Sequence, residues 1–90
     1  MSKTALITGA SQGIGACIAR RLAKDGFNIA VNCRSEAEVD NGGRQVAEEC
    51  RAAGVEAECF IASVSDFSAC EGLIKEVKER FGSIDVLINN

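Results

Sequence analysis

The sequence contains no His and no Tyr among its 90 residues. Proton transfer in an active site needs a titratable side chain within hydrogen-bond reach of the reacting atoms. The Asp and Glu residues offer no substitute, because their spacing is typical of solvated helix faces and not of paired catalytic carboxylates. We therefore expect this chain to hold a ligand better than it runs a reaction by itself.

Clusters of positive charge and long apolar runs are also missing. Lys and Arg number 10 against 13 Asp and Glu, which gives a formal net charge of -3. Phosphate backbones require clustered cations, so we expect no nucleic-acid partner, and no apolar run is long enough to cross a membrane. Because no charged and apolar leader precedes the first apolar segment, we expect a cytoplasmic location.

Paired cysteine spacing is a third absence. The sequence has 5 cysteines, an odd number, and none of them form a C-x-x-C motif. They lie at positions 17, 33, 50, 59 and 70. This pattern argues against a disulfide framework and against a zinc site, and we interpret the cysteines as small, reduced residues that fill space.

Short apolar segments alternate with helical ones along the whole chain. The apolar segments cover residues 4–8, 28–32, 57–62 and 84–89. Such alternation is typical of parallel strands joined by right-handed crossovers. We predict an α/β fold, β-α-β-α-β-α-β with strand order 3-2-1-4, which is the N-terminal half of a Rossmann-type doubly wound parallel sheet. No linker divides the chain, so we expect residues 1–90 to form a single domain.

Apolar residues at helical spacing predict which helix faces contact the sheet. The first helix, over residues 14–23, carries Ile14, Ile18 and Leu22. The third helix carries Cys70, Leu73, Ile74, Val77 and Phe81. Each stripe predicts a single buried face.

Glycines and polar residues mark the predicted helix ends. Three glycines stand where left-handed C-terminal caps are needed: Gly26, Gly54 and Gly82. Ser65 or Asp66 can cap the start of the third helix. Gly42 and Gly43 lie inside the middle helix, and each costs about 1 kcal/mol relative to Ala. We therefore predict that the N-terminal half of this helix is irregular.

The most specific feature lies between the first strand and the first helix, where residues 8–15 read T-G-A-S-Q-G-I-G. Gly9 allows a tight turn out of the strand, Gly13 lets backbone N–H groups approach a pyrophosphate, and Gly15 lets the helix pack closely. The helix N-terminus then presents free donors and the positive end of its dipole. This pattern predicts a binding site for the phosphates of a dinucleotide.

The glycine spacing resembles the short-chain dehydrogenases/reductases, whose fingerprint is T-G-x-x-x-G-I-G and whose fourth strand ends in D-x-L-x-N-N-A-G. Residues 85–90 read D-V-L-I-N-N, so the resemblance covers the whole chain. Within that family, the turn together with V-N-C-R-S at 31–35 looks most like the 3-oxoacyl-(acyl-carrier-protein) reductases. The resemblance implies a nicotinamide dinucleotide as the ligand. In the turn, it implies contacts from Gly9, Ser11, Gln12, Gly13, Ile14 and Gly15.

The end of the second strand bears on the choice of cofactor. An acidic residue there would accept a hydrogen bond from the ribose 2′-hydroxyl of NAD, and the matching position is Cys33. With Arg34 and Ser35 following, a 2′-phosphate would meet a cation and a hydroxyl, which favours NADP(H). The alternative is NAD(H) with Arg34 merely solvated, and Gln12 supports it, because NADPH-dependent relatives often carry Arg or Lys in that part of the turn.

Two further positions match the cofactor site of the family. After the third strand the family usually has D-V, whose Asp contacts adenine, and this sequence has Ser63 and Val64. A serine still offers one hydrogen bond, although residues 63–66 can equally be a helix-capping turn. By the same resemblance, Asn90 would pair with the backbone or with the ribose near the cofactor.

The catalytic part of the family pattern has no match. The resemblance implies that a tyrosine transfers the proton, that a lysine four residues further on lowers its pKa, and that a serine orients the carbonyl. Without Tyr, no Y-x-x-x-K motif exists here. We expect the chain to be the cofactor-binding portion of a reductase acting on a 3-oxoacyl thioester or a similar carbonyl. By itself it should be inactive, and its last strand should form an exposed, aggregation-prone edge.

Two alternatives remain open. The chain can be a complete small protein that binds a nucleotide without catalysis. It can also bind S-adenosylmethionine or a flavin nucleotide at the same turn. For the parent enzyme, the resemblance implies a homotetramer.

Overall fold

The computed structural model describes residues 3–90, which form a sheet of four parallel strands. The strands are β1 (Thr4–Ile7), β2 (Asn28–Cys33), β3 (Ala57–Ile61) and β4 (Val86–Ile88). Their order is β3-β2-β1-β4, as predicted, and each neighbouring pair is parallel. The predicted strands are confirmed, with ends that shift by one or two residues, as is usual for element boundaries.

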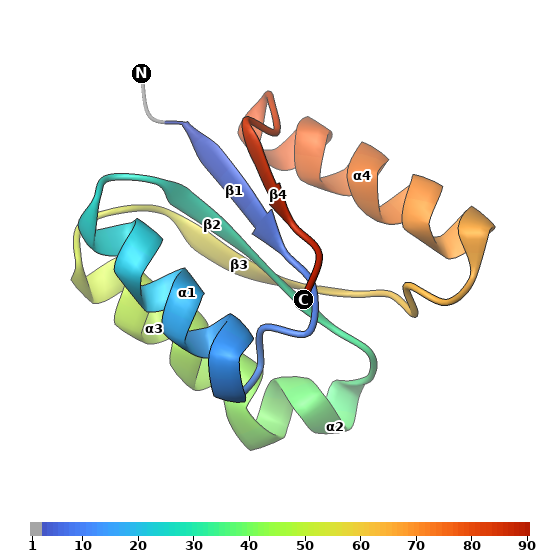
Figure 1. Cartoon of the computed structure of the whole chain (residues 1–90), viewed down its shortest axis with the longest axis horizontal. Coiled ribbons are helices and arrows are strands. Elements are labelled where there is room, and N and C mark those ends of the chain that lie inside the picture. Colours follow the sequence, from blue (N-terminus) through green and yellow to red (C-terminus); the bar gives the residue numbers. More distant parts are fainter. Residues whose placement is uncertain (1–2) are drawn as a thin grey trace.

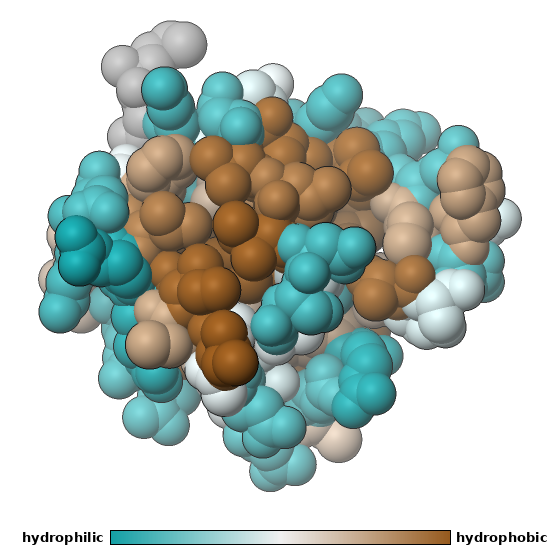
Figure 2. Space-filling view, in the orientation of Figure 1, coloured by the Kyte–Doolittle hydropathy of each residue, from teal (hydrophilic) through white to brown (hydrophobic). Residues whose placement is uncertain are grey.

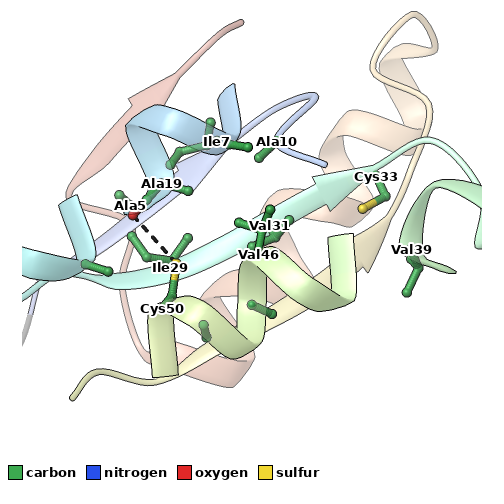
Figure 3. Packing of buried hydrophobic residues seen from close by; sticks show 14 residues of the cluster. Ala5, Ile7, Ala10, Ala19, Ile29, Val31, Cys33, Val39, Val46 and Cys50 are labelled. Carbon is green, nitrogen blue, oxygen red and sulfur yellow. Dashed lines mark hydrogen bonds between the residues drawn. The ribbon is translucent and has the colours of Figure 1, made fainter. Parts of the chain in front are cut away.

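Helices cover both faces of the sheet (Figure 1). Helices α1 (Gly13–Lys24) and α3 (Arg44–Ala52) lie on one face, and α4 (Phe67–Phe81) lies on the other. Because successive strand residues point to opposite faces, β1 and β2 supply two separate apolar clusters. The larger cluster includes Ile7, Ile29, Val31 and Val46 (Figure 3). The smaller consists of Leu6, Ala30, Phe60, Leu73 and Val77.

The predicted contact face of α1 is wrong in one respect. Ile18 and Leu22 pack against the core as predicted, but Ile14 is 73% exposed, and the fully buried positions include Ala16, Ala19 and Ala23. Small side chains let α1 approach the sheet and α3 closely, and the Cys50 thiol donates a hydrogen bond to the Ala19 carbonyl at 3.6 Å (Figure 3). Each alanine buries little apolar area, so alanines give a weak hydrophobic signal in the sequence. The predicted face therefore followed the larger side chains.

The middle crossover is irregular at its start, as predicted. It consists of α2 (Glu36–Glu38), the wide turn η1 (Val39–Gly43) and then α3. The structure adds a reason beyond helix propensity. A Cβ atom on Gly42 would collide with the backbone carbonyl oxygen of Ser11, and one on Gly43 would lie 2.5 Å from the Cys33 sulfur. Both glycines are therefore places where this crossover packs directly against the rest of the molecule.

Helix α4 begins and ends as the sequence indicated. The Asp66 carboxylate accepts a hydrogen bond from the Ser68 N–H at 2.9 Å, which makes Asp66 the N-cap in preference to Ser65. Gly82 ends the helix with φ +92°, the left-handed conformation. Leu73 and Val77 form its buried face, while Ile74 remains 38% exposed.

Strand β4 lies at one edge of the sheet and pairs with β1. Among residues 3–90 no strand covers its other side, and Leu87 is 55% exposed. Figure 2, which has the orientation of Figure 1, shows apolar side chains gathered on the side of the molecule where β1 and β4 lie. No helix in the described part of the chain combines the length and the apolar character needed to span a membrane.

An acidic side chain ties the central strand β1 to the edge strand β4. The Asp85 carboxylate accepts hydrogen bonds from the Thr4 N–H at 2.9 Å and from the Ser83 hydroxyl at 3.0 Å. These bonds, the backbone one first, hold the pKa of Asp85 below its usual range. Asp85 therefore stays ionised at neutral pH and aligns the start of β1 with the strand that follows it.

Candidate functional site

The glycine-rich turn between β1 and α1 has the backbone geometry that its sequence predicts. Gly9 and Gly13 adopt φ values of +59° and +62°, in the left-handed region that glycine occupies without strain. A Cβ atom on Gly15 would lie 2.7 Å from the Gly9 carbonyl oxygen. Gly15 thus allows the first turn of α1 to pack on the loop that precedes it.

The outer side of this turn is open. A Cβ atom on Gly13 would meet nothing within 4 Å. Gln12 precedes α1 in an extended conformation, and its side chain makes no capping hydrogen bond. The N–H groups of the first helical turn therefore remain available to an anion. Ile14, predicted as a contact in this turn, is exposed beside them.

A cavity of about 300 Å³ lies at the carboxyl ends of the strands, the edge at which parallel sheets usually bind ligands. It is lined by Gly9, Ser11, Gln12, Asn32, Arg34, Glu38, Val64 and Asn90. The predicted residues that do not line it are Gly13, Ile14, Gly15, Cys33, Ser35 and Ser63. The fold therefore brings together the glycine turn, the end of β2 and the end of the chain.

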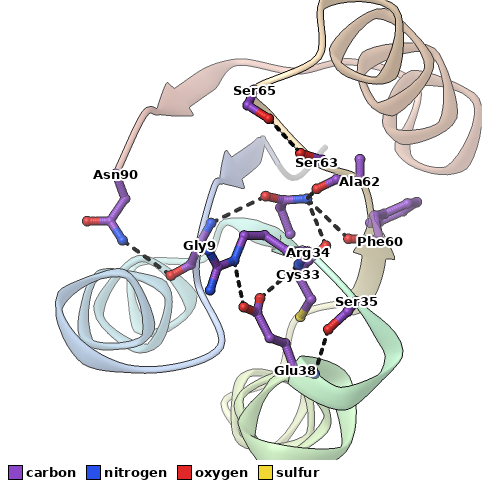
Figure 4. Close-up of polar contacts among 11 residues, drawn as sticks. Gly9, Cys33, Arg34, Ser35, Glu38, Phe60, Ala62, Ser63, Ser65 and Asn90 are labelled. Carbon is purple, nitrogen blue, oxygen red and sulfur yellow. Dashed lines mark hydrogen bonds and ion pairs between the residues drawn. The ribbon is translucent and has the colours of Figure 1, made fainter.

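Arg34 is paired at the end of β2 and not free in solvent (Figure 4). Its Nε atom lies 2.7 Å from one Glu38 carboxylate oxygen, and its backbone N–H donates to the other at 2.8 Å. The Ser35 hydroxyl accepts a hydrogen bond from the Glu38 N–H at 3.3 Å and so caps α2. Hydrogen bonds from Arg34, that of its backbone first, hold the pKa of Glu38 below its usual value.

The sulfur of Cys33 is buried and does not face the cavity. It lies against Gly43 and interacts with the thiol of Cys59 on the neighbouring strand. The hydrogen bond with Cys59, followed by burial, strongly raises the pKa of Cys33, whereas the same bond lowers the pKa of Cys59 to about 7. Of the two, Cys59 is therefore the thiol that ionises near neutral pH, and Cys33 donates to it.

This pair leads to a prediction about reactivity. We expect the rate of Cys59 alkylation by iodoacetamide to rise with pH with a midpoint near 7, because the thiolate is the nucleophile. Cys33 should stay unmodified in the folded chain because it is buried. Peptide mapping by mass spectrometry gives both rates.

The matched variant is Cys33→Ala, which removes the hydrogen-bond donor. In that variant the midpoint for Cys59 should move up toward about 8.5, the ordinary value of a thiol. An unchanged midpoint would show that Cys33 does not control the ionisation of Cys59.

Asn32 is a site residue that the sequence analysis did not single out. Its side chain is fully buried, and its Oδ1 atom accepts a hydrogen bond from the Gly9 N–H at 3.3 Å. Its amide nitrogen donates to the carbonyls of Phe60 and Ala62, at 3.3 and 3.2 Å. One amide thus links the glycine turn to β3, and a polar residue inside an apolar strand was the available signal.

The two remaining segments at the cavity, Asn90 and the turn at residues 63–66, are held by local hydrogen bonds. The Asn90 amide nitrogen donates to the Gly9 carbonyl at 3.2 Å, so Asn90 pairs with the backbone of the turn (Figure 4). Its own N–H donates to the Thr8 hydroxyl at 2.9 Å. The hydroxyls of Ser63 and Ser65 are 2.9 Å apart, while Asp66 caps α4. Ser63 therefore belongs to the capping turn, and Val64 is the part of it that lines the cavity.

Comparison with known proteins gives consistent matches over the whole chain. The family model described as short chain dehydrogenase matches residues 3–90. The chain is 47% identical over 90 residues to the 3-oxoacyl-[acyl-carrier-protein] reductase of Staphylococcus aureus. That match covers 100% of this chain and 35% of the relative. The chain thus spans about a third of the length of such relatives.

Solved structures similar to this chain contain both forms of the nicotinamide cofactor. The 3-oxoacyl-[acyl-carrier protein] reductase from Brucella melitensis, in complex with NAD, gives a TM-score of 0.87 at 34% identity. That match covers 100% of this chain and 33% of the other. A variant of actinorhodin polyketide ketoreductase with NADPH gives a TM-score of 0.85 at 44% identity, over 99% of this chain and 33% of the other.

Proposed function

Since the chain belongs to the short-chain dehydrogenase family, we propose that it is the cofactor-binding part of an NADP(H)-dependent oxidoreductase acting on a 3-oxoacyl thioester or a similar carbonyl. The observation that carries the proposal is the cavity in which the glycine turn, Arg34 and Asn90 meet. When bound, the nicotinamide cofactor supplies or accepts a hydride.

The residues present suit such a ligand. The open side of Gly13 and the free N–H groups at the start of α1 would bind the pyrophosphate. Asn90, held against Gly9, would lie beside the ribose, and Val64 offers an apolar surface for the adenine.

The preference for NADP(H) is supported by Arg34, whose side chain is 71% exposed and lies at the cavity. A guanidinium binds a phosphate more strongly than a hydroxyl, because the hydrogen bonds are charge-assisted. NAD(H) is the second candidate, and the carboxylate of Glu38 in the same cavity favours it.

The substrate and the setting of the reaction are further parts of the proposal. The similarity to 3-oxoacyl-[acyl-carrier-protein] reductases supports an acyl-carrier-protein-linked substrate. We further propose, from the family resemblance alone, that the parent enzyme is cytoplasmic and tetrameric. The chain contains no Tyr and no His to donate the proton that must accompany hydride transfer. We therefore expect the 90 residues alone to bind NADPH without oxidising it when a 3-oxoacyl thioester is added.

Binding is tested by calorimetric titration of NADPH and NADH, supported by thermal unfolding. A ligand that binds only the folded state raises the unfolding temperature by mass action. Replacement Arg34→Ala should raise the Kd for NADPH by about tenfold or more, because a hydrogen bond to a charged group is lost. The Kd for NADH should change by less than about threefold, since no 2′-phosphate is present.

The control is Arg44→Ala, which removes the same charge from an exposed residue whose partner is Asp40 and which does not line the cavity. It should leave both affinities unchanged. Tighter binding of NADH than of NADPH by the unmodified chain would contradict the NADP(H) part of the proposal, and binding of neither would contradict all of it.

A further inference from the structure

We propose that Glu38 sets the preference between the two nicotinamide cofactors, by competing with the 2′-phosphate of NADPH for the guanidinium of Arg34. The inference rests on the proposed function of this cavity. It concerns a residue that the cofactor-binding sequence pattern does not contain, four positions after Arg34 and outside the glycine turn.

The competition follows from the contacts that the Glu38 carboxylate makes. One of its oxygens lies 2.7 Å from Arg34 Nε, and the other accepts the Arg34 backbone N–H at 2.8 Å. The Glu38 side chain is 22% exposed and that of Arg34 is 71% exposed. The carboxylate thus occupies the inner side of the guanidinium, while the outer side remains open to solvent.

A second anion on this guanidinium would lie close to the carboxylate. Both groups would bind the same planar cation, so the separation between their charges would be only a few ångströms. The terminal phosphate of NADPH would carry nearly two negative charges, and the repulsion would oppose its binding. The ribose of NADH carries a neutral hydroxyl at that position, and this hydroxyl can donate a hydrogen bond to the carboxylate.

The Arg34–Glu38 pair differs from an ordinary surface ion pair because it lies at the candidate site. Glu38 lines the 300 Å³ cavity together with Arg34 and also a neighbouring cavity of about 210 Å³ with Ser11 and Gln12. The comparable pair four residues apart, Arg44 with Asp40, lines neither cavity. The pKa of Glu38 is held below its usual value, so its charge is present at neutral pH.

The test is the replacement Glu38→Gln. Glutamine keeps the shape and an oxygen that can accept the Arg34 N–H, but it removes the negative charge. The cap of α2 should persist, because the Ser35 hydroxyl bonds the backbone N–H of residue 38 and not its side chain. We expect the Kd for NADPH to fall by about tenfold, and that for NADH to change by less than about threefold.

The matched control is Glu36→Gln, which removes the same charge from an exposed position in the same short helix. Glu36 does not line either cavity, so this variant should leave the ratio of the two Kd values as it is. A second variant, Glu38→Ala, removes the carboxylate without adding an amide and should shift the ratio in the same direction. Circular dichroism confirms that each chain is folded.

The outcomes separate the inference from the function on which it rests. A ratio that shifts toward NADPH in both Glu38 variants and not in Glu36→Gln supports the role of Glu38. Intact binding with an unchanged ratio, or weaker NADPH binding in Glu38→Gln, overturns that role alone. If the unmodified chain binds neither nucleotide, the proposed function fails, and the inference fails with it.

Discussion

Replacement of Asn32 by Leu is expected to lower the free energy of unfolding by about 3 kcal/mol, because it leaves buried hydrogen-bonding groups without a partner. Asn32 is fully buried, and its side chain joins the Gly9 N–H to the carbonyls of Phe60 and Ala62. Leucine has a similar volume, so the loss would come from the unpaired polar groups and not from a cavity. Urea denaturation measures it as a lower midpoint.

The same replacement should weaken nucleotide binding. The Gly9 N–H is held by Asn32 Oδ1, and the Ala10 N–H donates to the Asn32 carbonyl at 3.1 Å. Only the first of these bonds is lost in the variant, so the turn stays attached to β2 while its first residues become less ordered. A less ordered turn must be fixed on binding, and that ordering lowers the affinity for NADPH.

A matched control lies at the other end of the same strand. Asn28 is half-buried, and its side chain accepts one hydrogen bond, from the Glu56 N–H at 3.0 Å. Replacement Asn28→Leu should cost about 1 kcal/mol or less, because water can replace the lost partner. Equal losses for the two variants would show that the buried amide has no special role in holding the turn.

Replacement of Gly42 by Ala is expected to destabilise the chain by about 1–3 kcal/mol and to weaken NADPH binding. A Cβ atom at this position would overlap the carbonyl oxygen of Ser11, which is backbone and cannot rotate away. Either the wide turn η1 or the glycine turn must shift to make room. Because Ser11 lines the candidate site, a shift of the glycine turn would change the shape of the cavity.

Gly72 provides the control for this second prediction. It lies within helix α4, and a Cβ atom there would meet nothing within 4 Å. Replacement Gly72→Ala should therefore stabilise the chain, by up to about 1 kcal/mol, because alanine favours the helix. Thermal unfolding of the two variants should give shifts of opposite sign. A stabilising Gly42→Ala would contradict the predicted overlap between a Cβ atom at this position and the Ser11 carbonyl oxygen.

Contacts within one turn could be predicted from the sequence, whereas contacts between distant segments could not. The glycines at 9, 13 and 15 could be interpreted from their spacing, because their role is local to one turn. Gly42 was interpreted only as a weak point in a helix, since its neighbour Ser11 is distant in the sequence. In the same way, the stripe of Ile14, Ile18 and Leu22 predicted the buried face of α1 only in part. Ile18 and Leu22 pack against the core, whereas Ile14 is exposed and the alanines of that helix make the fully buried contact.

The sequence by itself determined the parallel sheet, its strand order and the glycine turn between β1 and α1. Those features follow from the alternation of apolar segments, from right-handed crossovers and from residues that lie next to one another in the chain. Only the tertiary structure decided which side chains surround that turn. Asn32 hydrogen-bonds the turn, Glu38 lines the same cavity, and Gly42 packs against Ser11, because parallel strands end at the same edge of the sheet and bring segments that are distant in the chain together there.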